Sequence, residues 1–141
     1  MTAPANLLWE CVKKNNAFMR KSVNAPTMSA EPGNLMGLHS SAFSGLANTR
    51  AVGLSTKKSG KNKVLIMMTQ LAIRKSRKMR PKSMLPKTGI KRNSKKGEAQ
   101  LEKIMGKGFY RPDLLPLAIE KHRRLMRSFR KPRSKVVKGK K

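Results

Sequence analysis

The sequence predicts a small protein of the α+β class, in which strands and helices occupy different parts of the chain. An apolar run at residues 64–68 follows a polar turn and is typical of a buried strand. After residue 97, apolar residues instead recur at helical spacing. At 141 residues the chain can bury one core but not two. We therefore expect one small folded unit that combines a β-hairpin with C-terminal helices.

The first 56 residues have the composition of an ordinary globular segment, with five basic and two acidic side chains. Residues 7–14 predict a short turn or helix in which Trp9 anchors the fold, and residues 17–21 predict a strand. Pro26 and Pro32 then argue against a long regular element. The core expected from this part comprises Leu7, Leu8, Trp9, Cys11, Val12, Phe18, Met19, Leu35, Leu38, Phe43, Leu46 and Val52.

A β-hairpin is predicted over residues 51–56 and 63–70. Both runs are compatible with strands, and Ser59 with Gly60 between them is a turn signal. The five apolar residues 64–68 fit a buried helix as well as a strand, because periodicity does not separate the two over so short a run. The flanking turn residues favour the strand.

Residues 57–96 contain fifteen basic side chains and no acidic one. Within them, residues 74–96 alternate Lys and Arg with Ser, Pro and Gly, which leaves too few apolar residues for a packed unit. The prediction is an extended basic segment that is disordered when free and orders on a polyanion. The alternative is a solvated linker, although a linker seldom needs eleven basic residues.

The C-terminal third predicts two helices. The first covers residues 98–105, with acidic residues near its start, and ends at one of the glycines at 106 and 108. Residues 109–114 predict a turn in which Asp113 is the N-cap of the second helix. That helix starts at residue 115, has one apolar and one basic face, and ends before Pro132.

The expected organisation has four parts. They are a small α+β globular part with the hairpin (1–73), an extended basic RNA-binding segment (74–96), C-terminal helices (97–131) and a basic tail (132–141).

Catalytic, metal and cofactor sites are not expected. The single cysteine, Cys11, excludes an intramolecular disulfide and reads as a small buried apolar residue, and His39 and His122 have no metal-ligand spacing. Glu98 and Glu102 are the only acidic pair at helical spacing, and we expect them in an exposed first turn, where they complement the helix dipole. No Gly-rich phosphate loop is present. The sequence therefore argues against an enzyme, a small-molecule substrate or a cofactor.

Membrane insertion is not expected either, because the longest apolar run has five residues and a span needs about 20. The balance of 34 Lys and Arg against 6 Asp and Glu, a net charge of +28, decides the class of partner instead. A compact fold with this charge repels itself unless an anion lies against it. Nucleic acid is the expected partner, bound mainly through phosphates, and no homo-oligomer is expected.

Arginine binds phosphate bidentately and stacks on bases, so it is favoured over lysine for ordered contacts. The candidate RNA-binding residues are Arg20, Lys21, Arg50, Lys57, Lys58, Lys61, Lys63, Arg74, Lys75, Arg77, Lys78, Arg80, Lys82, Lys91, Arg92, Lys95, Lys96, Arg111, Arg123, Arg124, Arg127 and Arg130.

Four stretches in order carry a family resemblance: LLWECVKKNNAFMRK at residues 7–21, SAEPGNL at 29–35, SGLANTR at 44–50 and YRPDL at 110–114. Together they resemble the eukaryotic large-subunit ribosomal protein twenty-eight family. The resemblance implies a short antiparallel sheet with flanking helices and a C-terminal helical arm on ribosomal RNA (rRNA). It also implies a non-catalytic structural constituent of the cytosolic large subunit, next to other ribosomal proteins, that passes through nucleus and nucleolus during assembly.

Two alternatives remain open. A nucleolar assembly factor that binds pre-ribosomal RNA is the first, although the related factor looks longer, with zinc-ligand-like cysteines and an acidic C-terminal region. A DNA compactor similar to linker histones is the second, although such proteins carry longer Ala/Pro/Lys tails than this chain offers.

Overall fold

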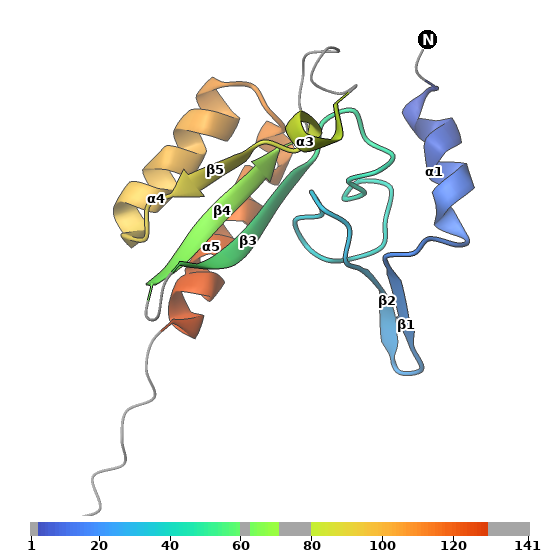
Figure 1. The fold of residues 1–141 in the computed structure, drawn as a ribbon, viewed down its shortest axis with the longest axis horizontal. Coiled ribbons are helices and arrows are strands. Elements are labelled where there is room, and N and C mark those ends of the chain that lie inside the picture. Colours follow the sequence, from blue (N-terminus) through green and yellow to red (C-terminus); the bar gives the residue numbers. More distant parts are fainter. Residues whose placement is uncertain (1–2, 60–62, 71–79, 130–141) are drawn as a thin grey trace, which may run out of the picture.

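The computed structural model describes residues 3–59, 63–70 and 80–129, and it confirms the α+β class (Figure 1). The described strands form a hairpin of β1 (Met19–Ser22) with β2 (Ala25–Ser29), and an antiparallel sheet of β3 (Val52–Ser59), β4 (Lys63–Gln70) and β5 (Lys87–Ile90). The described helices are α1 (Ala5–Lys13), α3 (Pro81–Met84), α4 (Ser94–Leu101), the π-helical η1 (Glu102–Lys107), the 3₁₀ turn η2 (Pro112–Leu114) and α5 (Leu115–Ser128).

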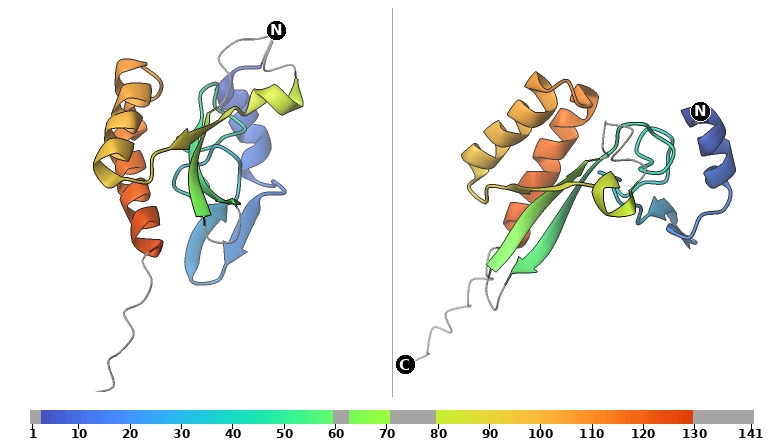
Figure 2. Two further views of the ribbon diagram at one scale, coloured as in Figure 1. Left: turned by 60° about the vertical axis from the view of Figure 1, so that its left-hand side comes forward. Right: turned by 45° about the horizontal axis from the view of Figure 1, so that its top comes forward.

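The β3–β4 hairpin is the predicted one, and residues 64–68 lie in a strand. Leu54 pairs with Met68, and Ile66 pairs with Ile90 of β5, so these apolar side chains share one face of the sheet. The helices α4 and α5 cover that face (Figure 2). The core between the two layers consists of Leu35, Val52, Leu54, Ile66, Met68, Ile90, Leu101, Met105, Tyr110, Leu114 and Ala118.

The opposite face of the sheet is half covered. Gly53 and Thr69 are buried at one end, where a loop passes so close that a Cβ on Gly53 would lie 3.0 Å from the Gly33 Cα. Toward the other end, Lys57 and Gly89 are exposed, and Gly89 has nothing within 4 Å of a Cβ built on it. This uncovered part is called the open sheet face below.

The N-terminal part contains the predicted helix and strand but not the predicted core. Helix α1 has no buried residue, Leu7 is 55% exposed, and Cys11 is exposed rather than buried. Of the twelve expected core residues, only Leu35 and Val52 are buried. The prediction was wrong because the core forms between the three-stranded sheet and α4 with α5, and the N-terminal part lies on the other side of the sheet (Figure 2).

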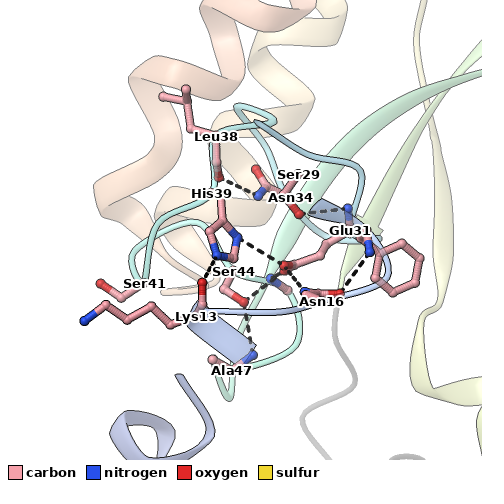
Figure 3. Close-up of polar contacts among 12 residues, drawn as sticks. Lys13, Asn16, Ser29, Glu31, Asn34, Leu38, His39, Ser41, Ser44 and Ala47 are labelled. Carbon is pink, nitrogen blue, oxygen red and sulfur yellow. Dashed lines mark hydrogen bonds and ion pairs between the residues drawn. The ribbon is translucent and has the colours of Figure 1, made fainter. Parts of the chain in front are cut away.

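Polar contacts connect the segments of the N-terminal part to one another, and the Glu31 carboxylate is their centre (Figure 3). Its side chain is fully buried. Asn16 Nδ2, Ser44 Oγ and the Gly45 amide each donate to it at 2.9 Å. The ring of His39 lies beside it, with Nδ1 3.9 Å from Oε1, while Nε2 bonds the Lys13 carbonyl at the end of α1 at 3.0 Å. One carboxylate thus links α1, the loop before β1 and residues 39–45.

The prediction of an extended basic segment at residues 74–96 is wrong for residues 80–96, which the structure describes. Residues 80–96 contain α3, the edge strand β5 and the first turn of α4, while residues 74–79 lie outside the described residues. Strand β5 needs few apolar residues because it buries one side chain, Ile90, and completes its backbone hydrogen bonds on β4.

Helix α4 starts four residues before the predicted helix. Asn93 is its N-cap, since its Oδ1 accepts from the Lys96 amide at 3.3 Å. The helix continues as η1 and ends at Gly108, as predicted, where a Cβ would lie 2.4 Å from the Ile104 carbonyl oxygen. Asp113 is not an N-cap: it lies inside η2 and its carboxylate pairs with Arg111. The second helix begins at Leu115, as predicted.

Candidate nucleic-acid interface

Six basic side chains gather where the start of α4 lies against the second half of α5. We name this surface the α4–α5 basic patch; it comprises Lys91, Arg92, Lys95, Lys96, Arg123 and Arg127, all of them exposed. A hollow of about 370 Å³ opens within it, lined by three of these arginines with Ser94, Met126 and Phe129. A hollow lined by both cationic and apolar side chains suits a phosphate with its attached sugar.

Close packing of the two helices positions this patch. Gly97 of α4 is buried against His122 of α5, and a Cβ on Gly97 would lie 2.6 Å from His122 Nε2 and from the Lys91 carbonyl oxygen. His122 is fully buried, so it faces the core side of α5 and not the solvent. Only glycine lets α4 approach so closely.

One ion pair joins the helices within the patch, through its member Arg123. Arg123 donates to both oxygens of Glu98, at 2.7 and 3.0 Å, and Ser94 Oγ donates to the same carboxylate at 2.8 Å. Hydrogen bonds from Arg123 and then Ser94 lower the pKa of Glu98 to about 2, and the bonds to Glu98 raise the pKa of Arg123. Glu98 is therefore an interhelical partner, not the exposed first-turn acid that was expected.

Arg92 is held by a different contact. Its guanidinium lies 5.4 Å from the centroid of the Phe129 ring, within the range of a cation–π interaction. This contact restrains a long side chain at the rim of the hollow, so that less conformational entropy is lost when an anion binds.

The open sheet face carries a second, smaller basic group. Lys57 of β3 and Lys87 of β5 are exposed, and a hollow of about 510 Å³ lies on the same side of the sheet, at the end that the loop covers, lined by residues that include Gly33, Gly53 and Lys87. Lys87 was missed as a site residue. The alternation of Lys87 and Gly89 with Thr88 and Ile90 could have revealed an edge strand with one polar face.

Two of the favoured arginines serve the fold. Arg111 donates to both Asp113 oxygens and to the carbonyls of Arg50 and Ala42, at 2.9 to 3.2 Å, and it lowers the pKa of Asp113. Arg50 in turn donates to the Phe109 carbonyl at 3.2 Å. These two residues tie the turn after η1 to the loop before β3. Arg124 pairs with Glu120 one helical turn away.

The remaining candidates are dispersed. Arg20 and Lys21 are exposed on β1, across the sheet from the patch, and Arg80 is exposed before α3 (Figure 2). The backbones of Lys58, Lys63 and Lys82 lie in β3, β4 and α3. Outside the described residues are Lys61, Arg74, Lys75, Arg77, Lys78 and Arg130.

Within the described ranges, no three His, Cys, Asp or Glu residues lie close enough to share a metal ion. The helices of the same part of the chain are too short or too polar to cross a bilayer. The described surface carries basic side chains next to small hollows, and this arrangement can bind anions.

Comparison with known proteins identifies a family for this chain. Residues 7–128 match the model of the ribosomal L28e protein family. The large ribosomal subunit protein eL28 of Schizosaccharomyces pombe is 27% identical over 133 residues, which cover 92% of this chain and 96% of that protein. The protein of the same name from Dictyostelium discoideum is 46% identical over 50 residues, 36% of this chain and 37% of that protein. Because the family model spans nearly the whole folded part, the chain belongs to the ribosomal L28e protein family.

Proposed function

We propose that this protein is a structural constituent of the cytosolic large ribosomal subunit that binds and neutralises rRNA and has no catalytic role. The observation that carries the proposal is the family match over residues 7–128, and both relatives are named as large-subunit proteins. The charge of +28 and the α4–α5 basic patch support rRNA as the ligand.

Binding would rest on phosphate neutralisation. Each Lys or Arg that contacts a phosphate releases condensed counterions, and this gain favours association at moderate salt. In the α4–α5 basic patch, Arg92 and Arg127 line the hollow and suit bidentate contacts, while Lys95 and Lys96 extend the positive surface along the first turn of α4. Neutralised RNA segments can then approach one another, which is how a basic protein stabilises a folded RNA.

Neighbouring ribosomal proteins are the second class of partner in this proposal. Helix α1 exposes Leu7 and Leu8, and the β1–β2 hairpin leaves Met28 38% exposed. Apolar side chains on the surface of so basic a protein suit a protein contact better than a phosphate backbone. Membranes, small-molecule substrates and a second copy of the chain are not among the proposed partners.

Sedimentation of the tagged full-length chain from cell lysate tests the proposal. We expect the chain to follow the large subunit through subunits, monosomes and polysomes, to stay with it when magnesium is chelated, and to transit the nucleus and nucleolus first. Restriction to nuclear pre-ribosomal particles would instead identify an assembly factor. Association with chromatin would contradict both ribosomal functions.

A further inference from the structure

Phe109 is a large aromatic side chain that the fold leaves in solvent. Its exposure is 77%, the highest of the aromatic residues in the described ranges, in a chain with only six Phe, Trp and Tyr residues. The adjacent Tyr110 shows the contrast, since it is 4% exposed and belongs to the core. Exposing a ring of this size to water gives up the stabilisation that burial provides.

The backbone that presents this ring is strained. Phe109 has φ +48° and Arg111 has φ +55°, and both lie in the left-handed region that side-chain-bearing residues seldom adopt. Such conformations cost free energy and persist where the surroundings impose them. Two such residues on either side of Tyr110 indicate that the fold keeps this turn in its conformation despite the unfavourable backbone free energy.

Contacts on every side fix the turn. The Phe109 amide donates to Gly106 O and the Tyr110 amide to Met105 O, both at 3.1 Å. The Tyr110 hydroxyl donates to the Ala51 carbonyl at 3.2 Å inside the core. The Phe109 carbonyl accepts from Arg50, whose own carbonyl accepts from Arg111. The ring is therefore held out by a rigid support, and a ligand that covers it does not have to pay for ordering a loop.

The rim of the exposed ring is cationic. Arg50 donates to the Phe109 carbonyl through one Nη and is itself exposed, and Lys107 is exposed two residues before the ring. The carboxylate of Asp113 is already engaged by Arg111. Proteins bind an unpaired base and its phosphate with exposed aromatic rings and nearby basic side chains.

We propose that Phe109 stacks on an unpaired nucleobase of RNA and that Arg50 contacts an adjoining phosphate. This inference rests on the proposed function, because it supposes that the RNA is part of the large subunit. The alternative is that a neighbouring protein covers Phe109. The basic residues near the ring and the net charge of +28 favour RNA.

Photocrosslinking in the assembled subunit tests the proposal. Phe109 is replaced by p-azidophenylalanine in the tagged full-length chain, large subunits are isolated from cells, and the sample is irradiated. We expect a crosslinked species that nuclease shortens and that maps to an unpaired nucleotide. A crosslink to another protein, or none at all in subunits that contain the chain, would overturn the inference while leaving the proposed function intact. A chain absent from large subunits would instead defeat the proposed function.

Binding of a single-stranded RNA 12-mer by the full-length chain gives an independent measurement. We expect Phe109→Ala to weaken binding about tenfold, as for the loss of one base stack, and Phe109→Trp to preserve it. Affinity for an abasic sugar–phosphate oligomer of equal length should be the same for all three proteins. Phe18→Ala, which removes a ring that is 38% exposed elsewhere, is the matched control and should change neither affinity. Equal loss on both oligomers, or no loss with the RNA, would contradict base stacking.

Discussion

Glu98 and Arg123 show how single residues join the two C-terminal helices. The carboxylate accepts hydrogen bonds from Arg123 and from Ser94, so its ionised form is favoured in the folded state. The pKa of Glu98 falls from 4.5 to about 2. In a chain with only 6 acidic residues, this one is placed where it connects α4 to α5.

This lowered pKa predicts a specific acid sensitivity. Because folding lowers the pKa, Glu98 contributes stability that is present above pH 4.5 and is lost as the pH falls toward 2. Glu98→Gln should melt at a lower temperature than the wild type at pH 6, and the difference between the two should shrink toward pH 2.5. Thermal unfolding followed by circular dichroism across this range measures it.

Glu102→Gln is the control for this prediction. Glu102 is exposed and lies one helical turn after Glu98. Its removal should leave the pH dependence close to that of the wild type. A Glu98→Gln variant that keeps the full acid sensitivity would show that the Glu98–Arg123 pair contributes nothing measurable.

At the scale of elements, the first turn of α4 carries positive charge, whereas an isolated helix is stabilised by negative charge at its N-terminus. Lys95 and Lys96 lie at the N-terminus, where the helix dipole is positive, and no acidic residue is present in that turn. Such placement disfavours the isolated helix by about 0.3–1 kcal/mol per charge. The pattern is unfavourable for the free protein, and an external polyanion would reverse the sign of its contribution.

The α4–α5 basic patch can be tested through these lysines. Changing Lys91, Lys95 and Lys96 to Gln should weaken binding to large-subunit rRNA and lower the slope of log affinity against log salt by roughly 2 to 3, if each contacts a phosphate. The same variant should melt at an equal or slightly higher temperature when free, since like charge is removed from a helix N-terminus. Filter binding over a salt series and thermal melting measure the two effects.

A variant with Lys13, Lys14 and Lys103 changed to Gln loses the same charge from exposed positions outside the patch. It should keep more of the wild-type affinity and salt slope. Equal losses in both triple variants would mean that binding follows net charge alone and that the patch has no special role.

At the scale of the whole molecule, two regions are held by different forces. The apolar core joins the three-stranded sheet to α4 and α5, whereas α1 buries no residue and the buried Glu31 carboxylate organises the N-terminal loops. Polar contacts contribute less net stability than apolar burial of similar extent, since they replace hydrogen bonds to water. The N-terminal part should therefore open before the core does.

Hydrogen exchange of the free protein measures this order of opening. Amides of residues 5–29 should exchange faster than those of residues 52–54, 66–69 and 118–122. Glu31→Ala should accelerate exchange in the first group and leave the second nearly unchanged, because the core does not contain Glu31. Simultaneous exchange of both regions in the wild type would contradict the division.

Several features could be predicted from the sequence because they depend on neighbouring residues. The β3–β4 hairpin follows from an apolar run beside a turn, and α5 follows from helical periodicity after Leu114. The proposed class of ligand followed from a charge that no fold could neutralise by itself. The quoted motifs led to the family that residues 7–128 match.

Other features depend on partners distant in the chain. Strand β5 exists because β4 offers it an unpaired edge, and a segment of alternating Lys, Ser and Pro does not reveal that edge. Arg123 looks like a free cation in the sequence, but Glu98, 25 residues earlier in the chain, pairs with it in the structure. The apolar residues of α1 read as core, yet the face of the sheet that forms the core is already occupied by α4 and α5.

Composition and local pattern thus predicted the class of ligand that we propose and most of the elements, because charge and periodicity are properties of the chain itself. Tertiary structure alone decided that Arg123 is ion-paired, since its partner Glu98 lies on another helix. It also decided that Tyr110 enters the core while Phe109 points into solvent, because the backbone of one strained turn directs two adjacent rings to opposite sides.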